Sequence, residues 1–151
     1  MNYELKQEVD AAGRIVRVAQ AYTDAQHVLD GYKNPSVSDR QWQACCLVAS
    51  RFLADPDAMT PQLCHHEWRL SQMRSSHPAF WPPAVATEWG DLSVTDRMLE
   101  SMGLRAMRDE LQRIETEQEE RLIAHLHADA QQMQDEALAG ALDQMLRNEG
   151  D

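Results

Sequence analysis

Glycine and proline are scarce in this chain, and most of them stand at the edges of segments with helical periodicity. Within these segments apolar residues recur at steps of three and four, and no window shows the alternating β-branched pattern of a half-buried strand. The sequence therefore predicts an all-α fold, a small helical bundle with a Trp- and Pro-rich packed loop and a long acidic C-terminal helix. We expect a helical core domain over 1–103 and an acidic helical extension, with coiled-coil pairing left open, over 104–151.

The ends of the first two helices can be predicted from single residues. Gly31 and Pro35 supply a stop for a helix that starts near the N-terminus. Ser38 and Gln41 have the spacing of a capping box, in which each side chain accepts a backbone hydrogen bond from the other residue. A second helix therefore begins after Ser38 and ends at Pro56.

A third, short helix begins after Thr60, a plausible N-cap, with Pro61 at its first position. Its periodicity predicts an apolar side made of Leu63, His66, Leu70 and Met73. The following segment, 75–92, has three prolines and two tryptophans, so it is too Pro-rich for a long helix and too apolar for a free linker. We expect it to pack on the helices, and Trp81 and Trp89 to border a ligand or partner pocket if it forms one.

The C-terminal third is almost continuously helix-forming and strongly acidic. Ser93 and Asp96 open this helix, and Gly103 is expected to interrupt or bend it. Residues 100–151 hold 13 acidic and 5 basic residues, a net charge of −8, whereas the preceding residues have a net charge of −3. The apolar stripe is lost in a charged segment whose candidate partner-binding residues are Glu115, Glu117, Glu119 and Glu120. These features are typical of a solvated helical face, or of a helix that pairs with itself or docks on a basic protein surface.

Overall charge excludes several classes of partner. A net charge of −11 repels phosphate backbones and anionic membrane surfaces, so direct nucleic-acid binding is not expected. No apolar run reaches the about 20 residues of a membrane span, and the N-terminus is too polar for a signal peptide. Three cysteines do not suggest a disulfide framework, and we expect a cytoplasmic protein with reduced thiols.

A cluster of reactive side chains, Cys64, His65 and His66 with His77 beyond a turn, raises the question of catalysis or metal binding. Three successive helical residues point about 100° apart, so at most two of them can face one ion. A Cys64 nucleophile activated by histidine has neither a recognisable oxyanion hole nor a third orienting group. We therefore expect no metal, no cofactor and no enzymatic activity, and keep a thiol or metal enzyme as a third alternative.

One stretch of the chain resembles a known family. The residues that carry the resemblance are Leu53, Ala54, Asp55, Pro56, Asp57, Thr60, Pro61, Gln62, His65, Trp68, His77 and Pro78. Their order and spacing resemble the RyR domain, a helical module found in ryanodine receptors and in bacterial and phage proteins, over residues 35–97. The family's Gly-Trp-x-Tyr-Gly hairpin has no counterpart, because Trp68 and His77 are nine positions apart with no glycine between them.

The resemblance implies a binding module of phage or mobile-element origin, in which His65, Trp68, His77 and Pro78 form a structural motif that fixes the loop on the helices. Our leading hypothesis is a non-enzymatic protein-interaction module, such as a phage-encoded inhibitor or adaptor that docks on a host protein. The alternative is a small-ligand domain that binds or senses a nucleotide or metabolite near Trp81 and Trp89.

Overall fold

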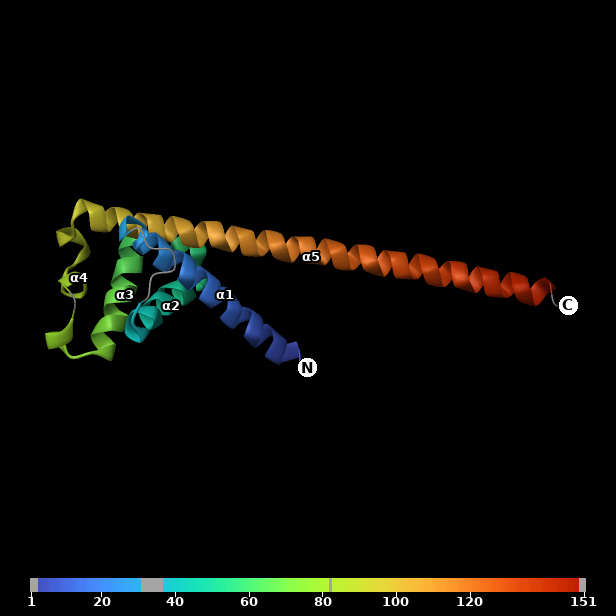
Figure 1. Ribbon diagram of the computed structural model, residues 1–151, viewed down its shortest axis with the longest axis horizontal. Coiled ribbons are helices and arrows are strands. Elements are labelled where there is room, and N and C mark those ends of the chain that lie inside the picture. Colours follow the sequence, from blue (N-terminus) through green and yellow to red (C-terminus); the bar gives the residue numbers. More distant parts are fainter. Residues whose placement is uncertain (1–2, 31–36, 82, 150–151) are drawn as a thin grey trace. The chain divides into compact units, whose positions relative to one another are not determined.

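The computed structural model describes residues 3–30, 37–81 and 83–149, and all regular structure in these ranges is helical, which confirms the all-α prediction (Figure 1). The α-helices are α1 (Tyr3–Gln26), α2 (Asp39–Ala54), α3 (Pro61–Ser75), α4 (Pro83–Ala86) and α5 (Val94–Glu149). Short 3₁₀ helices lie between them: η1 (Val28–Asp30), η2 (Pro56–Ala58), η3 (Pro78–Phe80) and η4 (Trp89–Asp91). Over the described ranges, no helix combines the length and the apolar content that a bilayer span requires.

Side-chain caps begin α2 and α3 where the sequence predicts them. The Ser38 hydroxyl accepts the Gln41 N–H at 3.2 Å, and the Gln41 side chain accepts the Ser38 N–H at 3.4 Å, which completes the capping box. The Thr60 hydroxyl accepts the Leu63 N–H at 3.2 Å, and Pro61 occupies the first helical position. Both predicted starts are confirmed, whereas the predicted stop at Gly31 and Pro35 lies outside the described residues.

The core forms where α2 packs against α1 on one side and α3 on the other. Burial of large apolar side chains is the main stabilising contribution here, at about 1.5–3 kcal/mol for each one fully buried. The buried side chains of these three helices include Val18, Ala19 and Tyr22 of α1, Ala44, Val48, Ala49 and Phe52 of α2, and Cys64 of α3.

The buried side of α3 differs from the predicted one. Leu63 is exposed and His66 is exposed, while Cys64, His65 and Gln72 are buried. The side that carries Leu63, His66, Leu70 and Met73 is therefore not the buried one, since Leu70 and Met73 are only half-buried and the helix buries two polar side chains, His65 and Gln72.

The loop between α3 and α5 packs on the helices, as predicted, through short helical turns. Pro78 begins η3 and Pro83 begins α4, positions at which a missing N–H costs nothing. Val85 and Leu92 are buried, and the Val85 carbonyl accepts a hydrogen bond of 2.8 Å from Arg69 Nε on α3. These contacts fix the loop over α3.

The chain divides into two compact units, residues 1–112 and residues 113–151, and α5 contributes to both. The boundary predicted after residue 103 lies inside the first unit, because Leu104 and Met107 are core residues. The predicted interruption at Gly103 was wrong, since α5 continues through it as one helix. A Cβ at this position would lie 2.7 Å from Cδ2 of Tyr22, so Gly103 allows α1 and α5 to approach closely.

Candidate functional site

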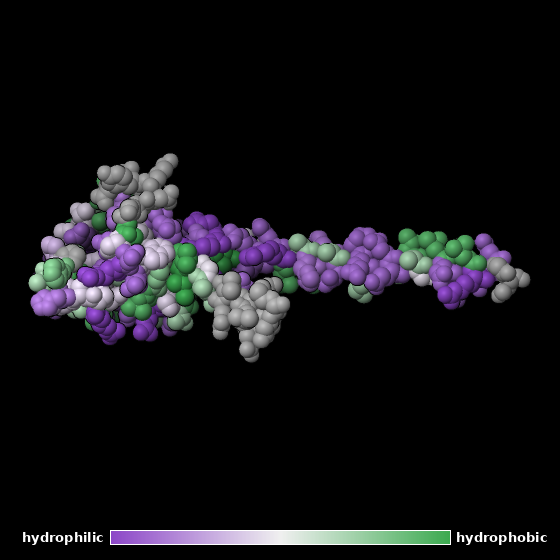
Figure 2. All heavy atoms as spheres, turned by 60° about the horizontal axis from the view of Figure 1, so that its bottom comes forward, coloured by the Kyte–Doolittle hydropathy of each residue, from purple (hydrophilic) through white to green (hydrophobic). Residues whose placement is uncertain are grey.

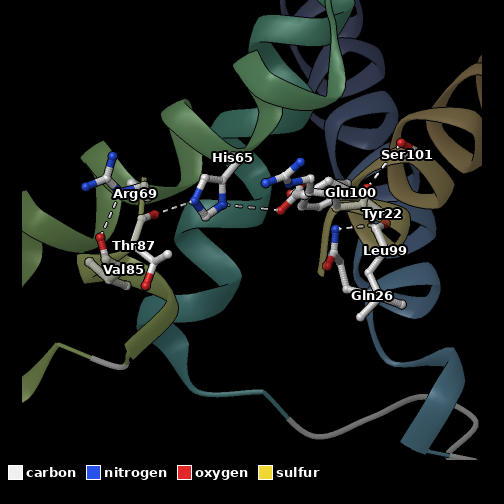
Figure 3. A network of polar contacts seen from close by, with 10 residues as sticks. Tyr22, Gln26, His65, Arg69, Val85, Thr87, Leu99, Glu100 and Ser101 are labelled. Carbon is white, nitrogen blue, oxygen red and sulfur yellow. Dashed lines mark hydrogen bonds and ion pairs between the residues drawn. The ribbon is translucent and has the colours of Figure 1, made fainter. Parts of the chain in front are cut away.

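A buried polar network joins α1, α3, α5 and the loop (Figure 3). Tyr22 Oη donates a hydrogen bond of 2.7 Å to Oε2 of Glu100, and Oε1 of the same carboxylate lies 3.8 Å from Nδ1 of His65. On the other side of its ring, His65 Nε2 lies 2.8 Å from the Thr87 carbonyl oxygen. His65 therefore stands between Thr87 and Glu100 and ties the loop to the helical core.

The hydrogen bond to Thr87 shows that Nε2 of the His65 ring carries a proton. A carbonyl oxygen only accepts, so Nε2 carries a proton and donates it. Nδ1 lies on the side of the ring that faces Glu100. In the neutral ring it presents a lone pair to the carboxylate, and in the imidazolium it presents an N–H that forms an ion pair with it. Both side chains are almost fully buried, at 4% exposed for His65 and 8% for Glu100.

A cavity of about 420 Å³ opens beside this network in the first unit. Its walls include Tyr22 and Gln26 from α1, His65 and Trp68 from α3, and Leu92, Thr95, Asp96, Leu99 and Glu100 from the start of α5 and the residues before it. We name it the Glu100 cavity. Its size lies within the range of small-ligand pockets, about 300–1,000 Å³.

A second, more open cavity of about 610 Å³ lies between α3 and η4. His65, His66, Arg69, Glu88 and Trp89 are among its lining residues. His65 borders both cavities, and its ring lies 6.3 Å from that of Trp89, centroid to centroid.

The two tryptophans predicted to border one pocket have separate surroundings. Trp89 lines the second cavity and lies under the guanidinium of Arg97, 6.0 Å from its ring centroid. Trp81 lines neither of these two cavities, and its Nε1 donates a hydrogen bond of 3.0 Å to the Ser76 carbonyl. The indole that borders the Glu100 cavity belongs to Trp68, which was predicted to be part of a structural motif.

The predicted structural motif has several different roles. Trp68 stacks on His65 with 6.1 Å between ring centroids. His77 is exposed, and its Nδ1 accepts the Ala79 N–H at 3.1 Å, so it caps η3, whose first residue is Pro78. Thus His65 holds the loop on α3 through Thr87, whereas His77 organises the loop locally.

The thiols are poorly placed for chemistry. Cys64 is fully buried, and burial raises the pKa of its thiol from 9.0 to about 12, so it stays protonated at neutral pH. Burial also raises the pKa of Cys45, to about 11. Within the described ranges, no group of three or more His, Cys, Asp and Glu side chains is arranged to hold a metal ion.

Over its described residues, 113–149, the second unit is a single helix with an unusual surface. Every residue from 121 to 149 is exposed, yet eight large apolar side chains are 46% to 69% exposed on this stretch. They are Leu122, Ile123, Leu126, Met133, Leu138, Leu142, Met145 and Leu146. Figure 2 shows apolar side chains gathered close to the C-terminal end of α5, beside strongly polar ones.

The four candidate glutamates lie on the same helix, just before the apolar residues. Glu115, Glu119 and Glu120 are exposed, whereas Glu117 is partly covered and has an interaction with a neighbouring group. The charged segment therefore presents carboxylates to solvent.

Comparisons with known proteins give no relative for this chain: no protein-family model, no curated protein and no solved structure matches it.

Proposed function

We propose that this protein is a non-enzymatic interaction module, an inhibitor or adaptor, whose C-terminal helix docks in a groove of a basic protein. One observation carries the proposal: the fully exposed helix from 121 to 149 presents eight large apolar side chains. Exposed apolar side chains gathered in patches on a charged helix are a mark of an interaction site. The resemblance to the RyR domain implies a module that binds and does not catalyse, and this hypothesis agrees with the proposal.

Six of the eight apolar side chains form two patches on different sides of the helix, while Ile123 lies between the two patches around the axis and Leu146 lies beside the second. At about 100° per residue, Leu122, Leu126 and Met133 fall within about 40° of one another. Leu138, Leu142 and Met145 fall within about 60°, and the centre of their patch lies about 150° around the axis from the centre of the first. We call these the first and second tail patches.

This arrangement is unsuited to one continuous coiled-coil seam. A heptad seam turns by about 20° for each seven residues, which gives about 45° over the 16 residues from Leu122 to Leu138. The observed offset is more than three times larger. An occupant that covers both patches must contact the helix from two sides, as a groove does.

Charge favours a basic protein over a second copy as the occupant. Residues 113–151 contain ten acidic and three basic residues, a net charge of −7. If two copies of the helix paired in parallel, the glutamates at 115–120 of one copy would face those of the other. If the copies paired antiparallel, these glutamates would face the C-terminal end of the other helix, which is also acidic. Like charges across an interface cost several kcal/mol, whereas a basic groove is attracted to this helix and guided onto it.

Photo-crosslinking can test the docking directly. A photoreactive residue replaces Leu142 in the full chain, inside the cells that naturally make it, and the crosslinked protein is identified by mass spectrometry. The purified partner is then titrated with the full chain by calorimetry. We expect a basic partner whose affinity falls at least about tenfold when Leu138→Gln, Leu142→Gln and Met145→Gln are combined, as loss of buried anchors predicts.

Matched variants separate groove binding from the alternatives. The corresponding triple substitution of Leu122, Leu126 and Met133 should weaken binding similarly, whereas Gln134→Ser with Gln144→Ser should leave it unchanged. A crosslink to a second copy of this chain would overturn the proposal, and so would binding that survives both triple substitutions.

A further inference from the structure

We propose that the Glu100 cavity binds a small organic cation, an amine or amidine, with its charged nitrogen beside Glu100 and its carbon body against Trp68. This inference concerns the first unit and stands independently of docking by the C-terminal helix.

The cavity is acidic in its charged lining. Asp96 and Glu100 border it, and among the described lining residues none is Lys or Arg. His27 and His65 are the basic groups there, and His65 already donates Nε2–H to Thr87. In a partly enclosed space of low effective dielectric, two carboxylates without a Lys or Arg beside them favour a cationic ligand.

Glu100 has room for another hydrogen-bond donor. A carboxylate can accept about four hydrogen bonds. Tyr22 donates one at 2.7 Å to Oε2, while His65 Nδ1 is 3.8 Å from Oε1, beyond hydrogen-bonding distance. An ammonium or amidinium N–H could therefore bind at Oε1, where the bond would be charge-assisted and stronger than a neutral one.

The negative field of Glu100 is already felt by its neighbour. The pKa of Tyr22 is raised well above its usual value, first by burial and then by the charge of Glu100. Only the smaller part of this shift, the part due to Glu100, reflects a negative potential, and that potential favours a cation in the adjoining space.

Trp68 supplies the apolar and π-electron surface that an organic cation needs. It is half-buried, lines the cavity, and is held in place by stacking on His65. An indole face attracts a cation that lies within about 6 Å of it, and indole is the best of the aromatic side chains for this contact. Leu92 and Leu99 complete an apolar wall for the rest of the ligand.

The same lining disfavours a nucleotide in the Glu100 cavity, which is a different place from the surroundings of Trp81 and Trp89 where a nucleotide was kept as an alternative. Phosphate groups are bound by Arg or Lys side chains, or by backbone N–H groups at a glycine-rich turn. The described lining has no Lys, Arg or Gly and has two carboxylates, so a phosphate would be repelled.

Calorimetry on the full chain provides the test, with benzamidine, phenethylamine and choline as probes. We expect at least one of these cations to bind at concentrations below about 1 mM. If benzamidine is the one that binds, its neutral isostere benzamide should bind at least about tenfold more weakly, because it lacks the charge. In Glu100→Gln, which keeps an acceptor for Tyr22, the affinity for the cation should fall at least about tenfold.

Two further variants of the lining, Asp96→Asn and Trp68→Leu, keep the test decisive if Glu100→Gln does not fold, and Asp109→Asn is their control. Asp96→Asn changes an exposed lining carboxylate and should weaken the cation about threefold, while Asp109→Asn, an exposed carboxylate outside the lining on α5, should have no effect. Trp68→Leu should also weaken binding. The proposal fails if none of the three cations binds up to about 10 mM, or if benzamide binds as tightly as benzamidine. It also fails if Asp96→Asn and Trp68→Leu both leave the affinity for the cation unchanged.

Discussion

Tyr22 and Glu100 are 78 positions apart in the sequence, and their side chains meet in a buried hydrogen bond of 2.7 Å that joins α1 to α5. Tyr22 is 1% exposed and Glu100 is 6% exposed, so neither group can exchange this bond for water without local opening. The bond connects the core to the His65 network, and it makes the start of α5 part of the first unit.

Tyr22→Phe should destabilise the first unit by about 1–3 kcal/mol, because the ring stays in place and the buried carboxylate loses its short donor. Urea unfolding followed by circular dichroism measures this change. A double-mutant cycle with Glu100→Gln provides the control, since the cost of Tyr22→Phe should shrink when the partner is uncharged. Equal costs in the two backgrounds would mean that the charge of Glu100 adds nothing to the strength of the bond.

Gly103→Ala should also destabilise the first unit, by about 1 kcal/mol net. Its Cβ would meet Cδ2 of Tyr22 at 2.7 Å, a clash that costs about 1–3 kcal/mol and outweighs the gain of about 1 kcal/mol in helix propensity. Gly13→Ala in α1 is the matched control, because its Cβ would meet nothing within 4 Å. That substitution should stabilise by about 0.5–1 kcal/mol, and a stabilised Gly103→Ala would contradict the close approach of α1 and α5.

Thr60→Ala should cost about 1 kcal/mol, because the Leu63 N–H loses its acceptor at the start of α3. Thr60→Ser retains the hydroxyl and should stay within about 0.5 kcal/mol of the natural chain. Thermal unfolding of the two variants side by side decides the point. If alanine and serine behave alike, the cap does not contribute to stability.

Local signals in the sequence were sufficient for most of the fold. Ser38 and Thr60 mark helix starts through hydrogen bonds to residues three positions away, so short-range reasoning finds them. The role of Gly103 could not be predicted this way, because the residue that requires it, Tyr22, is distant in the chain. A glycine that breaks a helix and one that allows two helices to approach have the same local sequence.

The candidate site was harder to predict for the same reason. His65 and Trp68 were predicted as parts of one structural motif with His77 and Pro78, but Glu100 was not predicted as a site residue, because an isolated glutamate in an acidic helix resembles its exposed neighbours. Its burial follows from contacts with α1 and α3 that only the tertiary structure brings together. Trp81 and Trp89 were grouped by sequence proximity, yet the first is tied to the Ser76 carbonyl and the second borders the cavity beside η4.

The buried thiols should make the protein sensitive to alkaline pH. Burial raises the pKa of Cys45 from 9.0 to about 11 and that of Cys64 from 9.0 to about 12. Above pH 9 the unfolded chain therefore loses protons that the folded chain retains, and the free energy of unfolding falls. The stabilisation is complete below pH 9 and is lost as the pH rises toward 11 and 12, by up to about 1.4 kcal/mol per pH unit for each thiol.

Urea midpoints measured from pH 8 to pH 10.5 test this dependence. We expect the decline to become shallower in Cys45→Ala and Cys64→Ala, whatever their stability at pH 8, because the slope depends on the titrating thiol and not on the packing lost. Cys46→Ala is the control, since Cys46 is only half-buried and should contribute a smaller part of the slope. Slopes unchanged in both buried-cysteine variants would show that other groups, Tyr22 foremost, cause the alkaline loss of stability, since burial and Glu100 raise its pKa as well.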